Sequence, residues 1–285
     1  MRYLNSLQPR SDSNRGLTRT DLLATLAVLT PLVLIQFAAL GNNRVRIDAT
    51  VCLSNFRRLA QAWQLYTDDN NGRLVLNNHG GGLMGTSQSP VNWARGWLDW
   101  ALAPDNTNAL LLIDDRWSRL GGYCGRSAEV FKCPADPFLS VQQRSRGWTA
   151  RVRSVSGNIG IGDGNAENGP WDPIYKHIKT VSEFIHPGPS ETWVYLEEHP
   201  DSINDTAFFN PYSSTWIDIP AVHHHGATAL GFADGHAELH RWTDSLSSPS
   251  VQRVGFQFIS PPVRTGDADV HWLSYRAGRV SERSY

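Results

Sequence analysis

The chain has 285 residues, and 26 Lys and Arg nearly balance 27 Asp and Glu, so the formal net charge is -1 at pH 7. This balance excludes a basic surface over the whole chain, so nucleic acid is not an expected partner. The 11 tryptophans and a hydrophobic content of 40% exclude wholesale disorder. Three cysteines are too few for a disulfide scaffold.

The N-terminal segment is much more apolar than the rest of the chain. Residues 22–40 carry no charge over 19 positions, and as a helix they would be roughly 28 Å long, close to the ~30 Å hydrocarbon core of a bilayer. Arginines precede the segment, and by the positive-inside rule they keep the N-terminus in the cytoplasm. The pattern predicts a single-pass membrane protein with an exported body. A buried helix and a cleaved secretory signal are the alternatives.

The helical pattern continues beyond the apolar segment. Apolar residues recur at spacings of 4, 3, 4 and 3, which places them on one face of a helix: Cys52, Phe56, Leu59, Trp63 and Tyr66. Turn residues at 68–72 end the pattern. We therefore expect one long helix over 17–67, with its first half in the membrane at 22–40 and its second half packed on a folded domain.

The body, residues 68–285, contains signals for strands. Residues 192–197 are rich in strand-forming side chains, and 223–242 holds two strand-like runs joined by Asp234-Gly235, a typical hairpin turn. Glycine-rich stretches between these runs predict loop-rich insertions. The expected fold class is α+β, with the long helix packed on an antiparallel β-sheet.

The segment from Gly16 to Leu23 resembles the processing site of type IV prepilins and type II secretion pseudopilins. The resemblance implies that prepilin peptidase removes the leader 1–16, cutting between Gly16 and Leu17, and methylates Leu17. It also implies that Asp21, at the fifth mature position, contacts the α-amine of a neighbouring subunit during assembly. The family usually has Phe where Leu17 stands and Glu where Asp21 stands.

A second motif lies in the hairpin. His224, nine residues and then Asp234-Gly235 resemble the H-X9-DG signature of prepilin-type processing-associated proteins, and further blocks similar to that group follow in order along the chain. The resemblance implies a pilin-like fold and a structural subunit that assembles into a pilus or a secretion-type fibre, not an enzyme. Its implied partners are prepilin peptidase, other pilin-like subunits and inner-membrane lipid, with the C-terminal domain in the periplasm or on a fibre.

Histidines and carboxylates near the hairpin suggest a divalent metal, although no cofactor is certain from the sequence. Imidazole and carboxylate together suit zinc, whereas oxygen ligands from the acidic loop before the hairpin suit calcium. The alternative is a polar network that only supports the turn. The candidate ligands are Glu198, Asp201, Asp205, His224, Asp234 and His236.

The three cysteines would lie outside the cytoplasm, where disulfides persist. Cys52 and Cys133 both lie in blocks that resemble the family, and the resemblance favours a disulfide between them. A bond between Cys124 and Cys133 is the rival, and the sequence leaves the connectivity open.

Two other function classes remain open. The first is a membrane-tethered metal-binding protein or hydrolase that uses the hairpin histidines. The second is a surface adhesin or carbohydrate-binding protein, because a Gly- and Asn-rich segment contains Trp93, Trp97 and Trp100, which could form a stacking platform.

Overall fold

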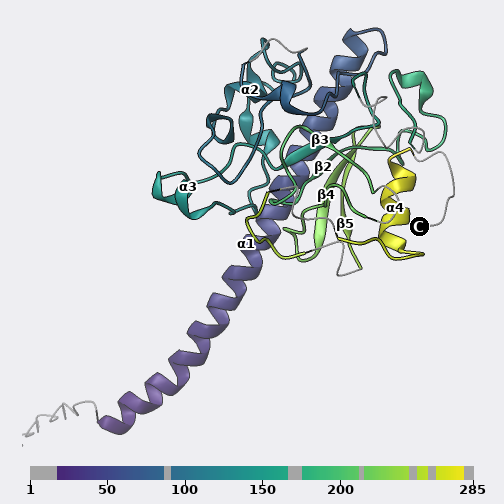
Figure 1. Ribbon diagram of the computed structural model, residues 1–285. Helices are drawn as coiled ribbons and strands as arrows, with labels where there is room; N and C mark the ends of the chain where they lie inside the picture. Colours follow the sequence, from purple (N-terminus) through teal and green to yellow (C-terminus); the bar gives the residue numbers. More distant parts are fainter. Residues whose placement is uncertain are drawn as a thin grey trace, which may run out of the picture. The chain divides into compact units, whose positions relative to one another are not determined.

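Figure 1 shows the computed structural model of the chain. It describes residues 18–86, 91–165, 175–211, 215–243, 249–255 and 261–278, without the side chains of 32–45. The chain divides into two units, residues 1–44 and 45–285, and the boundary falls inside the first helix. The expected leader 1–16, with Gly16 and Leu17 at its cleavage site, lies outside the described residues.

Helix α1 runs from Arg19 to Asp69 and is capped at both ends. At its start, the Thr18 amide donates to Asp21 Oδ2 at 2.9 Å, and the Asp21 amide donates to Thr18 Oγ1 at 3.2 Å, which together form a reciprocal N-terminal cap. At its end, Gly72 has a φ of 78° and its amide donates to the Thr67 carbonyl at 2.9 Å. A glycine in this left-handed conformation is a common way to stop a helix.

The expected membrane anchor is not supported. Of the described residues, no helix contains a stretch long and apolar enough to cross a bilayer. The fold prediction of a membrane-embedded first half of α1 was therefore wrong, and so was the location as a single-pass inner-membrane protein.

Over the part of the chain that the structure describes, the body is built on a five-stranded sheet with the order β3-β1-β2-β4-β5. Its strands are β1 (Val155–Asn158), β2 (Trp193–Glu197), β3 (Ala207–Phe208), β4 (Ala227–Phe232) and β5 (Ala237–Arg241). Strands β1, β2, β4 and β5 pair antiparallel in that order, but β3 pairs parallel to β1. The sheet is thus mixed, and the expectation of a purely antiparallel sheet was wrong. A two-residue strand is too short to show the alternation that reveals strands in a sequence.

Short helical turns fill much of the remaining body, as expected of loop-rich insertions. They are η1 (Gly81–Leu83), η2 (Pro104–Asn106), α2 (Leu110–Ile113), η3 (Ala128–Phe131), α3 (Val141–Ser145) and η5 (Val181–Glu183). The last described helix, α4 (Ala268–Arg276), is capped by Asp267, whose side chain accepts from the amides of Asp269 and Val270.

The two faces of the sheet bury different helices (Figure 1). On one face, Phe56 and Ala60 of α1 lie against Gly231 of β4, where the absence of a side chain lets the helix approach closely. On the other face, Leu273 of α4 accepts a hydrogen bond from the Trp193 indole at 3.3 Å. Two hydrophobic clusters, one on each face, exclude water from the sheet. Charged side chains that enter this region must find partners inside it.

Candidate metal centre

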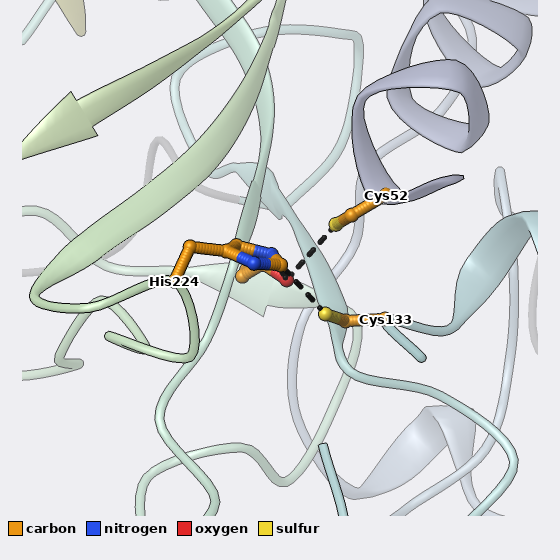
Figure 2. Close-up of side chains that lie close together, drawn as sticks. Cys52, Cys133 and His224 are labelled. Atoms are coloured by element: carbon orange, nitrogen blue, oxygen red, sulfur yellow. Dashed lines mark hydrogen bonds and ion pairs between the residues drawn. The ribbon is translucent and has the colours of Figure 1, made fainter. Parts of the chain in front are cut away.

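Four potential metal ligands meet between α1 and the sheet. Within the described ranges they form a single group whose ligand atoms all lie within 4.8 Å of one another, made up of Cys52, Cys133, Glu197 and His224. Figure 2 shows the side chains of Cys52, Cys133 and His224 pointing toward one another from separate parts of the chain. Each of the four is buried, with an exposed fraction between 0% and 4%. This group can hold a metal ion.

Different local structures position the four ligands. Cys52 lies on the buried face of α1, four residues before Phe56, so the same helical periodicity that packs the core also places the thiol. Cys133 follows η3, where its amide donates to Ser154 Oγ at 2.7 Å. Glu197 is the last residue of β2. His224 precedes β4 in a tight turn closed by the Ala227 amide, which donates to the His224 carbonyl at 3.2 Å.

The ligand atoms already contact one another. The Cys52 thiol donates to Glu197 Oε1 at 3.0 Å, His224 Nε2 lies 3.3 Å from the same oxygen, and Cys133 Sγ lies 3.4 Å from His224 Nε2. In tetrahedral zinc with bonds of about 2.0–2.3 Å, neighbouring ligand atoms are about 3.3–3.8 Å apart. Two of the three spacings above, 3.3 and 3.4 Å, fall in this range, the third is 0.3 Å shorter, and all ligand atoms lie within 4.8 Å of one another.

Backbone amides support the group from outside. The Ala229 amide donates to Glu197 Oε2 at 2.8 Å, and the Ala135 amide donates to Cys133 Sγ at 3.3 Å. Such outer contacts fix the orientation of a metal ligand and tune its basicity. His224 Nδ1 is buried and has no partner among the described residues.

The electrostatics of the group favour a cation. Burial, reinforced by Cys133 and by the charge of Glu197, raises the pKa of the Cys52 thiol well above its usual range. Burial opposes the protonation of His224, but hydrogen bonds to Cys133 and Glu197 outweigh it and raise the pKa of His224 to about 10. Burial also opposes ionisation of Glu197, yet contacts with the histidines win and lower its pKa. Without a metal, Cys52 and His224 therefore hold protons on the atoms that would otherwise bind the ion.

The expected disulfide is not formed. Cys52, Cys124 and Cys133 are all free, buried thiols. Cys52 and Cys133, the pair that the resemblance favours, lie close together without a bond, and their sulfurs share the site with a carboxylate and an imidazole. Cys124 lies elsewhere in the core, where burial raises its pKa to about 12.

The metal ligands expected from the sequence do not converge. Only His224 belongs to the group. Glu198 accepts a hydrogen bond from the Ser202 hydroxyl at 2.8 Å. Asp205 accepts from the backbone amides of Gly80 and Ala207. Asp201 is bonded by the Trp100 indole at 2.9 Å. These acidic residues therefore support loops, each through its own contacts.

The two halves of the H-X9-DG motif lie at opposite ends of the β4–β5 hairpin. His224 precedes β4, whereas Asp234 and Gly235 form the turn after it, about 20 Å away along a strand of six residues. Asp234 accepts from the His236 amide at 3.1 Å and contacts the His236 ring at 2.5 Å. Gly235 has a φ of 90°. In this protein the motif therefore combines one candidate metal ligand, His224, with the two turn residues Asp234 and Gly235, which lie at the other end of the hairpin.

The sequence does not predict Glu197, and instead suggests its neighbour Glu198. The signal that could have revealed Glu197 is its position as a charged residue at the end of a strongly apolar strand. Tyr195 and Glu197 are two residues apart in β2, so their side chains lie on the same face of the sheet. Tyr195 belongs to the same buried cluster as Cys52 and Cys133. The alternation along the strand therefore points Glu197 toward the thiols.

Comparisons with known proteins give no match to a protein-family model, to a curated protein or to a solved structure.

Proposed function

We propose that this protein is a zinc protein in which Cys52, Cys133, Glu197 and His224 bind one Zn²⁺ that holds α1 to the sheet. The convergence of four buried ligands from four separate segments carries the proposal. Two thiols and an imidazole suit a soft or borderline metal, and zinc is the commonest ion with this donor set. Calcium is disfavoured because it takes six to eight oxygen ligands.

The site favours a structural role over catalysis. A catalytic zinc keeps one coordination position for water or substrate, whereas four protein ligands close a tetrahedral ion. All four residues are buried, so substrate has no direct approach to them. The expected hydrolase alternative therefore has less support than a structural centre that links distant parts of the chain.

Metal analysis of the full chain, purified without a histidine tag, tests the proposal. We expect one zinc per chain in the wild type and a loss of zinc in Cys52→Ser. Cys124→Ser is the matched control, because Cys124 is an equally buried free thiol outside the group, and it should retain the metal. A metal-free chain whose thermal stability is unchanged by added zinc would contradict the proposal.

A second candidate is assembly of the protein with copies of itself through α1, as the pilin-like resemblance implies. Five large aliphatic side chains are 50% or more exposed on the N-terminal part of this helix: Leu22, Leu23, Leu26, Val28 and Leu29. Exposed apolar surface of this kind favours association. We expect the native protein to begin at Leu17 and to form oligomers that Leu26→Asp weakens. N-terminal sequencing and sedimentation velocity test this, and an unprocessed monomer would contradict it.

A further inference from the structure

A small cavity lies away from the metal centre, beside the tryptophan-rich segment. It has a volume of about 130 Å³, and its lining includes Trp97, Asp99, Trp100, Arg151, Asp201 and Ile203. The two tryptophans and Asp99 are half-buried, whereas Arg151 and Asp201 are buried. Trp93 belongs to the core instead, where it stacks on Phe131, so it does not join the platform that the sequence suggests.

Arg151 is the unusual member of the lining. Its side chain is 1% exposed, and its guanidinium carbon lies 4.2 Å from the centre of the Trp100 ring. Nη2 donates to the Pro200 carbonyl at 3.1 Å, but Nε and Nη1 have no hydrogen-bond partner among the described residues. A buried guanidinium with unused donors is destabilising unless something accepts from it. Arg151, which lines the cavity, therefore keeps donor capacity that no described residue uses.

The same cavity also offers acceptors. Asp201 accepts from the Trp100 indole through Oδ1 and from the Gln252 amide through Oδ2. Asp99 uses Oδ1 for the Ala101 amide and the Asn106 side chain, while no described residue donates to its Oδ2. A carboxylate oxygen has two lone pairs, so both residues retain capacity to accept further hydrogen bonds.

The charges around the cavity determine what it can take. Two carboxylates and one guanidinium line it, so an anion meets an excess of negative charge, and a cation has no lone pair with which to accept from Arg151. A neutral molecule avoids both costs. It must accept from Arg151, donate to Asp99 or Asp201, and present an apolar face to the indole of Trp97.

A sugar ring has these properties, since each hydroxyl both donates and accepts and the ring C–H groups pack on aromatic faces. We propose that this cavity binds one sugar unit of a glycan, through two neighbouring hydroxyl groups held between Arg151 and the carboxylates of Asp99 and Asp201. The site is independent of the zinc proposal, because none of its lining residues belongs to the metal-ligand group.

Saturation-transfer NMR on the full chain tests the proposal, with three probes added separately: methyl α-D-mannopyranoside, methyl α-D-glucopyranoside and methyl β-D-galactopyranoside. Glycerol and sodium acetate serve as a small polyol and an anion. We expect at least one glycoside to bind with a Kd on the order of millimolar. Trp97→Ala and Asp99→Asn should each raise that Kd at least tenfold, since each removes one part of the recognition.

Trp148→Ala is the matched control, because Trp148 is also half-buried but does not line the cavity. It should leave the Kd unchanged. Circular dichroism and thermal melts of each variant check that the fold persists. Three results would overturn the proposal: no glycoside binds, acetate or glycerol binds as tightly as the best glycoside, or binding survives in both cavity variants. In the first case, buried water would be the partner of Arg151.

Discussion

Glu197 and Glu198 are consecutive in the chain, yet their carboxylates join two separate buried networks. Glu197 accepts from the Cys52 thiol at 3.0 Å and from the Ala229 amide at 2.8 Å. Glu198 accepts from the Ser202 hydroxyl at 2.8 Å, and its Oε2 has no partner among the described residues. Burial raises the pKa of Glu198 to about 8, whereas the histidines beside Glu197 overcome burial and lower its pKa. Neighbouring glutamates therefore have opposite charge preferences near neutral pH.

This difference makes the stability of the protein depend on pH through Glu198. Because its pKa is about 8 when folded and near 4.5 when unfolded, the folded state binds more protons between these values. The contribution of Glu198 to stability is full below pH 4.5 and declines as the pH rises toward 8. We expect the melting temperature of the wild type to fall more steeply between pH 5 and 8 than that of Glu198→Gln, which cannot ionise.

Thermal melts over this range measure the effect, with Asp69→Asn, a change at the exposed end of α1, as the control that should follow the wild type. Parallel curves for Glu198→Gln and the wild type would mean that the buried carboxyl does not titrate in this window.

Zinc affinity should rise with pH. The pKa of His224 is raised to about 10 and that of the Cys52 thiol lies well above its usual range, so both carry protons at neutral pH in the metal-free protein. The metal displaces these protons when it binds. Each displaced proton strengthens apparent binding about tenfold per pH unit, and we expect at least that slope between pH 6.5 and 8.5. Competition with a chromogenic chelator, corrected for the chelator's own titration, gives the slope, and a flat profile would show that no ligand proton is released.

Removal of zinc should loosen the attachment of α1. The Cys52 ligand lies in the C-terminal half of this helix, and the other three ligands lie in the loops and sheet against which it packs. We expect a chelator to increase amide hydrogen exchange around residues 48–56, and to lower the free energy of unfolding by about 4 kcal/mol when free zinc had been a thousandfold above its Kd.

Exchange measured by mass spectrometry compares the wild type with Cys52→Ser. The variant should show the faster exchange without chelator and should not respond to it. Equal exchange in the wild type with and without chelator would indicate that packing alone holds the helix.

The turn of the hairpin should matter for stability but not for metal binding. Gly235 has a φ of 90°, and a Cβ placed there would lie 2.6 Å from Gln64 Oε1. We expect Gly235→Ala to destabilise the protein by about 1–3 kcal/mol and to retain one zinc per chain. Gly188→Ala is the control, since nothing lies within 4 Å of its added Cβ. Urea unfolding and metal analysis check both, and zinc loss in Gly235→Ala alone would tie the turn to the metal centre.

The sequence predicts best the elements whose cause is local. The spacing from Cys52 to Tyr66 predicts the C-terminal part of α1, and Asp234-Gly235 predicts the β4–β5 hairpin, because helix periodicity and turn chemistry depend on residues close in the chain. The parallel pairing of β3 with β1 is a tertiary contact between segments far apart in the chain, and a strand of two residues is too short for its sequence to predict it.

Of the four residues at the site, the sequence suggests only His224 as a metal ligand, whereas it suggests Cys52 and Cys133 as disulfide partners. Their union with Glu197 depends on the register of β2 against its neighbours, which no local pattern predicts. Trp193 lies opposite Phe232 and Leu196 opposite Leu230, with a bulge between them, and this register brings the end of β2 to the segment that holds His224. A shift of one residue would exchange Glu197 for Glu198 at the metal centre.

The spread of the metal ligands along the chain also bears on biosynthesis. Cys52 leaves the ribosome first and His224 last, with Cys133 and Glu197 between them. A nascent chain therefore cannot complete the proposed coordination sphere until residue 224 has been made. Chain segments that must wait for distant partners fold late. Metal loading would thus have to wait for His224, and a truncated chain that ends before this residue would lack one of the four proposed ligands.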